Sequence, residues 1–568
     1  MTNTWHELDP YRGKFFDGEW PTITQMFNIT LSRFPERSCF TVYDPERKSY
    51  TYTQVAELIK KIGSKMIEAG VKKGDRVLLN GKNSIQWGLG YLAVNYCGAV
   101  VVPIDNQMHI DRCQKLAAFA DCSYILADSD VIEKLDKEDE WFKGVYGIMT
   151  LLGEAEGIEN VMTAEPETIR ESVKIGDDDL AALLFTSGTT GNEKAAMLTN
   201  KNIVSDTYLV ADGMGCTEND TLYALLPLHH SYCCTTVLLE TIKHGAECLF
   251  GHGIIITRML NDLKKGHVTI FMGIPLLYNK LLAGIEKGME KKGKAVNTLL
   301  HAMMSINGFF KQNFNYSPFK KFFRKKILSQ LGLENNNLLI CGAGPLAPEV
   351  FKKYNQLGLD FVQGYGLTEC APVVTLNPKD HFKTASIGKA LKGMEVIIAE
   401  PNEQGIGEIR VKGPNVTPGY YLDKEHTDEL FDENGYLKTG DLGSVDKEGY
   451  FFIRGRAKNL IVTEGGKNVY PEEIEDAFQT NPAIEQIMVR GYMAKKDVPA
   501  EQIEAVIFPS QDYYKGKSKE EIEEDIEKEV KKVNLTLLAY KRIDKITILE
   551  ERMQETTTRK IKRNTVAN

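Results

Sequence analysis

The feature that most constrains the fold is an alternation of short apolar runs with amphipathic stretches, which continues to about residue 375. The apolar runs are bounded by Gly, Pro or Asp, as in DRVLLNG, AVVVPID, CSYILAD, DTLYALLPL, VTIFMG and NLLICGAG. Amphipathic segments such as YTQVAELIKKIGSKMIEAG lie between them. Strands that alternate with helices in this way predict α/β layers built on mainly parallel sheets.

From about residue 387 the texture changes to short strand-like runs separated by Gly and Pro turns, namely MEVIIAE, GEIRVKG, GYYLD, GYLKTGD and GYFFIRG. This pattern predicts a small β-rich subdomain over about 387–456. A chain of 568 residues is also too long for a single hydrophobic core. We therefore predict a large N-terminal domain, residues 1–456, made of two α/β-layered subdomains and the β-rich subdomain.

A further unit begins after GRAKN at 455–459, which is the clearest boundary in the sequence. It opens with the helical stretch YPEEIEDAFQT, where Pro471 stands near the first turn, and continues with strand-like IEQIMVRGYM and EAVIFPS. In SKEEIEEDIEKEVKKV, Ser518 and Glu521 fit a capping box at the start of a second helix. Residues 460–568 are thus predicted to form a small α+β domain.

Charge and cysteine usage argue against several classes of protein. The net charge of −9 disfavours general nucleic-acid binding, which needs a basic face. The ten cysteines include no CxxC pair, so we expect a reduced, cytoplasmic chain without a disulfide framework or zinc site. The N-terminus lacks the apolar core of a signal peptide. The apolar stretch 87–104 is short for a membrane span and holds Asn95, so it predicts a buried helix from near Asn83 and a following strand.

An apolar run ends abruptly in LLFTSGTTGNEKAAML, residues 183–198, at a cluster of hydroxyl groups and glycines followed by a lysine. The spacing does not match GxxxxGK followed by Ser or Thr, so this is not the common phosphate loop of nucleotide-binding proteins. The glycines still allow close backbone approach to an anion, and the hydroxyls and lysine add donors and positive charge. Taken alone, such a loop is more often a plain connection. The candidate anion-binding residues are Thr186, Ser187, Gly188, Thr189, Thr190, Gly191 and Lys194.

Three further motifs follow this loop in order: QGYGLTECAPVV, YLKTGDLG and IRGRAKNLIVTEGGKNVYPEEIE. With them the chain, from about residue 20 to its C-terminus, resembles the adenylate-forming (AMP-binding) superfamily, and most closely a long-chain fatty acid–CoA ligase. The resemblance implies a two-step reaction. A carboxylate attacks the α-phosphate of ATP to give an acyl-adenylate and pyrophosphate, and a thiol then displaces AMP to give a thioester.

The resemblance also implies roles for the residues of these motifs. The loop at 186–194 would hold the β- and γ-phosphates. Tyr365 would stack on adenine, Thr368 would meet the α-phosphate and Glu369 would bind Mg²⁺, a hard cation that prefers carboxylate oxygens. Asp441 would accept the ribose hydroxyls and Arg456 would assist at ribose and phosphate. The site would also include Gly364 and Gly366 of QGYGLTE, and Gly342, Ala343 and Gly344 of CGAGPL.

The last motif, TTTRKIKR at 556–563, resembles the family's GKI-like tripeptide. Lys560 matches the catalytic lysine, which would neutralise charge where a carboxylate and the α-phosphate meet. The chain departs from the family pattern at three positions: Arg559 replaces Gly, Glu193 stands where Pro is usual, and Ala195 stands where Gly is usual. We expect Glu193 to point outward from the phosphates.

The resemblance implies that the C-terminal domain rotates between the two half-reactions. Residues 457–459 would form the hinge, with Lys458 as the hinge residue, because a hinge is a short segment that absorbs the backbone change. After rotation EGGKNV, residues 464–469, would approach the active site, with Gly465 and Gly466 along the CoA pantetheine path. A plain hairpin turn explains the same two glycines.

Two segments bear on the acid. In LPLHHSY, His230 occupies the family's His position, where it would guide the carboxylate and gate the thiol path, and His229 occupies an aromatic position. Adjacent histidines are a poor metal site. Residues 287–326 carry ten Lys or Arg against one acid, Glu290, together with several Phe. This segment predicts either a solvated helical hairpin beside the acyl tunnel, which we slightly favour, or a patch that contacts an anionic membrane.

We therefore predict an acid–thiol ligase that converts a fatty acid, with long chains favoured, ATP and CoA into acyl-CoA, AMP and pyrophosphate, with Mg²⁺ as cofactor. Alternatives within this chemistry are a medium-chain or aryl acid–CoA ligase and an acyl-acyl carrier protein synthetase. An alternative of another class is a catalytically inactive nucleotide-binding protein, which only the departures at Glu193, Ala195 and Arg559 support. We expect a cytoplasmic protein, peripheral to the inner face of a membrane if 287–326 binds lipid, and make no prediction of its oligomeric state.

Overall fold

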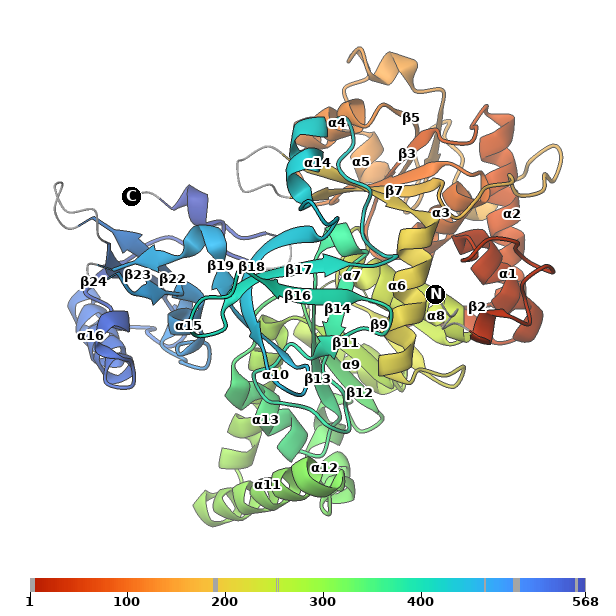
Figure 1. Cartoon of the computed structure of the whole chain (residues 1–568). Helices are drawn as coiled ribbons and strands as arrows, with labels where there is room; N and C mark the ends of the chain where they lie inside the picture. Colours follow the sequence, from red (N-terminus) through yellow and green to blue (C-terminus); the bar gives the residue numbers. More distant parts are fainter. Residues whose placement is uncertain are drawn as a thin grey trace.

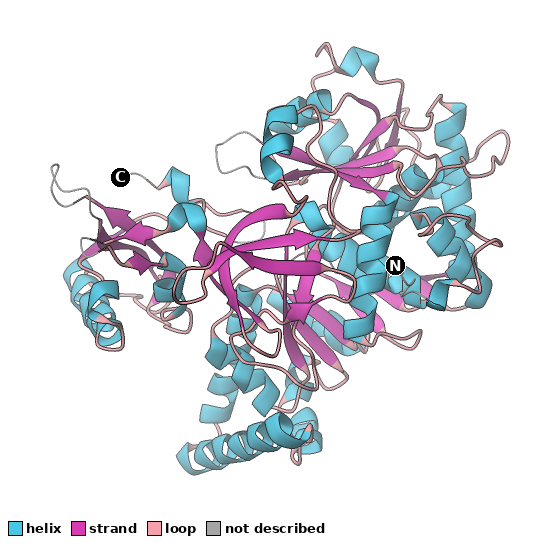
Figure 2. Ribbon diagram, viewed as in Figure 1, coloured by secondary structure: helices cyan, strands magenta, loops and turns pink. Residues whose placement is uncertain are grey.

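Two large sheets with flanking helices form the body of the molecule, and a smaller sheet connects them to a separate C-terminal lobe (Figures 1 and 2). This computed structural model describes residues 6–186, 193–251, 253, 255–463, 466–493, 501–556 and 560–566. Within these residues the fold is α/β with an added small α+β unit, as predicted from the sequence.

One large sheet has the strand order β6-β5-β3-β4-β7-β8. Only β7 and β8 pair antiparallel among its described strands; the other pairs are parallel. Every residue of β4 (Val100–Pro103) is buried, as expected for a strand covered on both faces. The other strands are β3 (Arg76–Asn80), β5 (Cys122–Ala127), β6 (Gly147–Thr150), β7 (Leu180–Thr186) and β8 (Lys194–Thr199).

The second large sheet has the order β15-β14-β13-β12-β11-β9-β10-β1-β2. Its central strands pair in parallel, and antiparallel strands close both edges. The strands are β1 (Ser38–Val42), β2 (Lys48–Thr51), β9 (Thr221–Ala224), β10 (Glu247–Phe250), β11 (Ile270–Gly273), β12 (Leu338–Cys341), β13 (Phe361–Gly366), β14 (Val373–Leu376) and β15 (Lys389–Ala390).

Helices cover these sheets, and several begin at local sequence signals. In α2 (Tyr52–Glu68) Thr51 and Gln54 form a capping box. The predicted buried helix is α3 (Ile85–Tyr96), which is capped by Ser84 and buried along nearly its whole length. None of the described helices is both long and apolar enough to span a bilayer. The other helices of this region are α1 (Ile23–Arg33), α4 (Ile110–Phe119), α5 (Ser129–Ile132), α6 (Asn200–Met214), α7 (Ser231–Cys233), α8 (Glu240–His244), α9 (Ile256–Lys265), α10 (Pro275–Glu290), α13 (Pro348–Gln356) and α14 (Lys424–Leu430).

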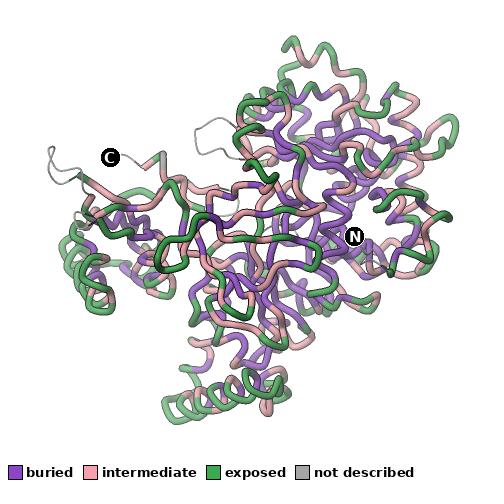
Figure 3. The backbone as a smooth tube through the Cα atoms, viewed as in Figure 1, coloured by how far each residue is buried: buried purple, intermediate pink, exposed green. Residues whose placement is uncertain are grey.

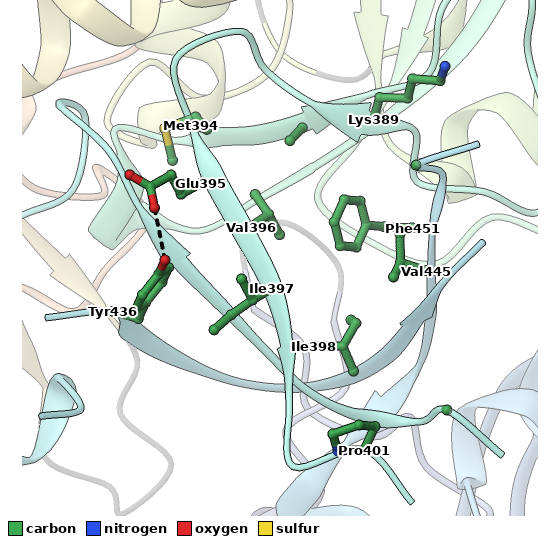
Figure 4. Close-up of a pocket in the computed structure, with 13 residues that line it drawn as sticks. Lys389, Met394, Glu395, Val396, Ile397, Ile398, Pro401, Tyr436, Val445 and Phe451 are labelled. Carbon is green, nitrogen blue, oxygen red and sulfur yellow. Dashed lines mark hydrogen bonds between the residues drawn. The ribbon is translucent and has the colours of Figure 1, made fainter. Parts of the chain in front are cut away.

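The predicted β-rich subdomain is an antiparallel sheet in the order β16-β17-β18-β19. A pocket of about 940 Å³ opens on it, lined by residues such as Val396, Ile398 and Phe451 (Figure 4). The prediction of a strand at GYYLD is wrong, because 419–423 forms a turn with isolated bridges. The strands are β16 (Glu395–Ala399), β17 (Gly407–Lys412), β18 (Leu437–Val445) and β19 (Phe451–Arg456).

The C-terminal lobe has its own hydrophobic core, in which Ile474, Phe478 and Ile526 are buried. The predicted capping box at α16 (Lys519–Asn534) is present, with reciprocal bonds between Ser518 and Glu521. The remaining elements are β20 (Ile461–Val462), β21 (Asn468–Val469), α15 (Pro471–Asp476), β22 (Ile484–Tyr492), β23 (Gln502–Pro509) and β24 (Lys545–Ile548).

The basic segment 287–326 forms the end of α10, α11 (Lys294–Phe314) and α12 (Lys320–Lys326). It projects from the lower end of the molecule in Figure 1. One face of α11, including Leu300 and Met304, is buried, and the helix packs against α10 and α13. Most of the remaining α11 surface is exposed (Figure 3).

Candidate active site

The motif QGYGLTE lies where β13 ends, in strand residues and a 3-10 turn at Thr368–Cys370. A Cβ at Gly366 would lie 1.9 Å from the Pro372 carbonyl oxygen, so only glycine fits this approach of two backbones. The turn therefore presents Tyr365, Thr368 and Glu369 beyond the carboxyl end of a parallel strand, which is where open α/β sheets bind ligands.

Tyr365, Asp441 and Arg456 form a connected cluster. The Tyr365 hydroxyl donates to Asp441 Oδ2 at 2.6 Å, and Arg456 Nε lies 2.8 Å from Asp441 Oδ1. The pairing of β18 with β19 sets Asp441 opposite Arg456, so the sheet register fixes this ion pair. Burial raises the pKa of Asp441, whereas Arg456 and Tyr365 act to lower it. Since a carboxylate has about four acceptor positions, Asp441 retains capacity for further donors such as ribose hydroxyls.

Glu369 is held by a residue that the sequence analysis missed. The Tyr420 hydroxyl donates to Glu369 Oε1 at 2.7 Å, and Lys194 Nζ lies 5.2 Å from the centre of the Tyr420 ring. Tyr420 therefore connects the lysine after the phosphate loop with the predicted Mg²⁺ ligand. Its position comes from backbone pairing with β8, in which Tyr421 N donates to the Ala195 carbonyl oxygen. The mistaken strand assignment at GYYLD hid this role.

The donors around Glu369 fit Mg²⁺. This ion is commonly held by one or two carboxylates together with phosphate oxygens and water. In the part of the chain that the structure describes, no three His, Cys, Asp or Glu residues gather as a metal site. The Glu369 carboxylate, with one oxygen held by the Tyr420 hydroxyl, fits the role of a single protein ligand.

The predicted phosphate loop is described only at its two ends. Ser187, Gly188, Thr189, Thr190 and Gly191 lie outside the described residues. Thr186 pairs with Lys194 across the β7–β8 hairpin, and its hydroxyl donates to the Lys194 carbonyl oxygen at 3.4 Å.

Glu193, at the base of this loop, does not face solvent. Its Oε1 lies 2.7 Å from Nη2 of Arg112 on α4, and its side chain is only 13% exposed. The charge that departs from the family pattern is therefore compensated by a neighbouring cation, and Arg112 is a second residue that the sequence analysis missed.

The CGAGPL loop follows β12 and packs against a tyrosine. A Cβ at Gly342 would lie 3.0 Å from the ring of Tyr232, so glycine at this position admits the ring. The Tyr232 hydroxyl donates to the carbonyl oxygens of Gly273 and Ile340, each at 3.4 Å. The neighbouring Ala343 has a positive φ of 63°. Much of the room expected beside Gly342 is thus taken by Tyr232.

The imidazole rings of His229 and His230 contact each other at an interplanar angle of 48°, with their centroids 4.3 Å apart. Burial lowers the pKa of His229 to about 4, and burial together with the charge of His229 lowers that of His230 to about 3. Both rings are therefore neutral near pH 7. Asp105, a further residue missed from the sequence, lies 3.9 Å from His229 Nε2, and burial raises its pKa.

Lys560 reaches the same cluster from the C-terminal lobe. Desolvation and the charge of Arg456 lower its pKa, while Asp441 acts to raise it. In turn Lys560 lowers the pKa of both Asp441 and His230. The Lys560 N–H donates to Thr556 Oγ1, and the Thr556 N–H donates to the Lys560 carbonyl oxygen, so two hydrogen bonds hold the lysine backbone beside Thr556. The exposed Lys560 is thus within electrostatic range of Asp441, Arg456 and His230.

The predicted hinge and CoA residues follow β19 in the chain. Lys458 stands in a 3-10 turn, Ala457–Asn459, and burial lowers its pKa. Gly466 has φ of +67° in the turn between β20 and β21, and a Cβ added there would meet no described atom within 4 Å. Backbone conformation therefore explains this glycine; Gly465 lies outside the described residues.

Comparison with known proteins finds relatives along most of the chain. In mouse, the long-chain-fatty-acid–CoA ligase ACSBG2 is 26% identical over 84% of this chain and 76% of its own. ATP-bound MatB from Rhodopseudomonas palustris aligns with a TM-score of 0.75 at 24% identity, over 96% of this chain and 98% of its own. A complex of the Bacillus subtilis o-succinylbenzoate CoA synthetase MenE with ATP and magnesium aligns with a TM-score of 0.71 at 22% identity, over 95% and 98%.

Family models cover most of the sequence. Residues 27–421 match the model described as AMP-binding enzyme, and residues 458–568 match the AMP-binding enzyme C-terminal domain. These matches confirm the resemblance inferred from the motifs. The chain belongs to the AMP-binding enzyme family.

Proposed function

We propose that this enzyme is an acid–thiol ligase that activates a fatty acid with ATP and transfers the acyl group to CoA. The observation that carries the proposal is the Tyr365–Asp441–Arg456 cluster, with Lys560 of the C-terminal lobe within electrostatic range of Asp441, Arg456 and His230. The charge of a lysine on the C-terminal lobe therefore acts on the residues of the N-terminal domain that we expect to bind ATP. The CoA ligases among the relatives support CoA as the thiol acceptor.

In the first half-reaction a carboxylate oxygen attacks the α-phosphorus of ATP, and pyrophosphate leaves. Asp441 accepts the ribose hydroxyls, Tyr365 covers adenine and Thr368 donates to an α-phosphate oxygen. Lys560 lies between the two anions and offsets their repulsion as they approach. Lys194 and the loop at 186–194 bind the outer phosphates. Mg²⁺, held by Glu369, would supply further charge neutralisation there.

In the second half-reaction the CoA sulfur attacks the acyl carbonyl carbon and AMP leaves. We propose that the C-terminal lobe turns about residues 457–459, with Lys458 at the pivot, so that Lys560 withdraws and the Gly465–Gly466 turn approaches the thiol path. His230 is neutral at pH 7, so it acts as a hydrogen-bonding group beside this path rather than as a charge.

A long acyl chain is the substrate that we favour. The relatives named for long-chain fatty acids support it, whereas MatB and MenE show that similar folds serve other acids. Tyr232, beside Gly342, is the side chain that we propose as a wall of the acyl pocket. Medium-chain and aryl acids, and acyl carrier protein as the thiol, remain the alternatives that substrate tests distinguish.

We further propose that 287–326 contacts an anionic membrane surface, where long acyl chains reside. Three apolar side chains of α11 support this: Leu299 and Phe309 are each 60% exposed and Phe314 is 65% exposed. Basic residues precede α11 at 287–294 and follow it at 320–326 in the sequence. Apolar insertion with flanking lysines is the usual mode of interfacial helices.

Vesicle sedimentation tests the membrane contact. We expect binding to vesicles with anionic lipid at low salt, weaker binding at high salt, and loss of binding in Leu299→Ser/Phe309→Ser. Leu535→Ser, at a leucine of the C-terminal lobe that is 74% exposed, is the control. Binding that does not depend on anionic lipid would leave 287–326 as a solvated hairpin.

The decisive assay for the reaction is pyrophosphate release with a series of fatty acids, with and without CoA or holo-acyl carrier protein. We expect carboxylate-dependent release that favours long chains, and thioester formation with CoA. No release with any acid would instead favour a nucleotide-binding protein without catalysis.

A further inference from the structure

One glutamine of the C-terminal lobe joins it to the N-terminal domain. Gln479 follows α15, and three hydrogen bonds cross the joint at this residue. Its Oε1 accepts from the Ala347 N–H at 2.8 Å, its Nε2 donates to the Pro345 carbonyl oxygen at 3.2 Å, and its own carbonyl oxygen accepts from Asn279 Nδ2 at 3.4 Å.

The amide of Gln479 is oriented by all of its partners. The second hydrogen of Nε2 is donated to Asp476 Oδ1 at 2.6 Å, so the nitrogen faces two acceptors and the oxygen faces a backbone donor. A flipped amide would place like groups against each other, which leaves one orientation satisfied. The side chain is thus fixed from its own lobe by Asp476 and is matched to two main-chain groups of the other.

The partners of Gln479 belong to the loop that lines the site. Pro345 and Ala347 lie just after Gly342–Gly344, between β12 and α13. Ala347 is the N-cap residue of α13, so its N–H has no partner within that helix. Docking of the C-terminal lobe therefore satisfies a buried backbone donor beside the CGAGPL loop.

We infer that Gln479 is a positioning residue. Its bonds to Pro345 and Ala347, which we call the clasp, hold the C-terminal lobe in the arrangement that directs Lys560 toward the Asp441–Arg456 pair. The inference rests on the proposed two-step function. Rotation about 457–459 would break the bonds to Pro345 and Ala347, so the clasp serves adenylate formation and not thioester formation. Asp476, which accepts a hydrogen bond from Gln479 Nε2, is itself buried. Burial raises the pKa of Asp476 to about 7, and the charge of the neighbouring Glu475 adds to the shift.

The test compares Gln479→Met, which keeps length and loses the polar groups, with Gln511→Ala, which changes an exposed glutamine of the same lobe. We expect Gln479→Met to slow carboxylate-dependent pyrophosphate exchange about 10-fold, as the loss of two cross-lobe hydrogen bonds suggests. CoA-dependent consumption of a supplied acyl-adenylate should stay within about twofold of the parent rate. Equal slowing of both half-reactions would overturn the clasp in favour of a general structural role.

A second readout does not depend on activity. Because the Ala347 N–H donates to Gln479, deuterium exchange at that amide should accelerate in Gln479→Met and remain unchanged in Gln511→Ala. Unchanged exchange in Gln479→Met would contradict the clasp. If the parent enzyme releases no pyrophosphate with any acid, the proposed function fails while the exchange result still decides whether the clasp exists.

Discussion

The Tyr365–Asp441–Arg456 cluster and Lys560 contribute to one site in different ways. Tyr365, Asp441 and Arg456 lie within one domain and are connected by direct bonds of 2.6 and 2.8 Å. Lys560 acts on this cluster through its charge, and its position depends on how the C-terminal lobe docks. The first region is preorganised by sheet register, whereas the second can be withdrawn without dismantling the site. A reaction that needs a cation in one step and free access in the next can use this difference.

Replacing Lys560 with Ala should have the largest effect, because it removes the one group of the site that the C-terminal lobe supplies in our proposal. We expect adenylate formation to fall about 10³-fold, because no cation then offsets the repulsion between carboxylate and α-phosphate. Consumption of a supplied acyl-adenylate by CoA should change less than about threefold. Pyrophosphate exchange and single-turnover thioester formation measure the two steps.

Lys562→Ala is the matched control for this change, since Lys562 is the next lysine of the same basic tail. A folded Lys560→Ala enzyme that loses both half-reactions would contradict a lysine that acts only when its lobe is docked.

Asp441→Asn tests the preorganised region. It removes the charge that pairs with Arg456 and leaves one acceptor oxygen where the carboxylate has two, so it weakens ribose binding in both steps. We expect kcat/KM for ATP to fall about 30-fold, and both half-reactions to slow together. Steady-state kinetics at varied ATP check this, with the exposed Glu433→Gln as control. An effect confined to adenylate formation would contradict the proposal that Asp441 serves both half-reactions whereas Lys560 serves only the first.

Tyr420→Phe tests whether the support of Glu369 matters for the proposed Mg²⁺ site. The change removes the 2.7 Å hydrogen bond to Glu369 and keeps the ring beside Lys194. We expect about a fivefold loss of adenylation rate and a shift in the Mg²⁺ concentration for half-maximal rate. An unchanged Mg²⁺ dependence would separate Tyr420 from the role proposed for Glu369.

Arg112→Ala should have the smallest effect, because Arg112 is half exposed and such ion pairs contribute little. It leaves Glu193 uncompensated near the phosphates, so we expect the KM for ATP to rise about threefold. Adding Glu193→Gln should restore it, since no unpaired charge then remains. Failure of the second change to rescue the first would show that Arg112 acts other than by compensating Glu193.

Much of the fold could be predicted because its signals are local. The capping box of α16 and the buried run of α3 depend on residues a few positions apart. GYYLD was assigned wrongly because a Gly followed by two aromatics resembles a strand, whereas pairing with β8 makes it a turn. That distant pairing also brings Tyr420 to Glu369, which no pattern around either residue indicates.

The sequence by itself determined the family, the layered α/β architecture and the identity of the motif residues, since ordered motifs and periodicity are properties of the chain alone. Only the tertiary structure decided which charges meet. Three interactions join residues far apart in the chain: the ion pair of Glu193 with Arg112, the electrostatic interaction of Lys560 with Asp441, and the hydrogen bonds of Gln479 with Pro345 and Ala347. Coulomb and hydrogen-bond energies depend on separation in space, which sequence distance does not determine.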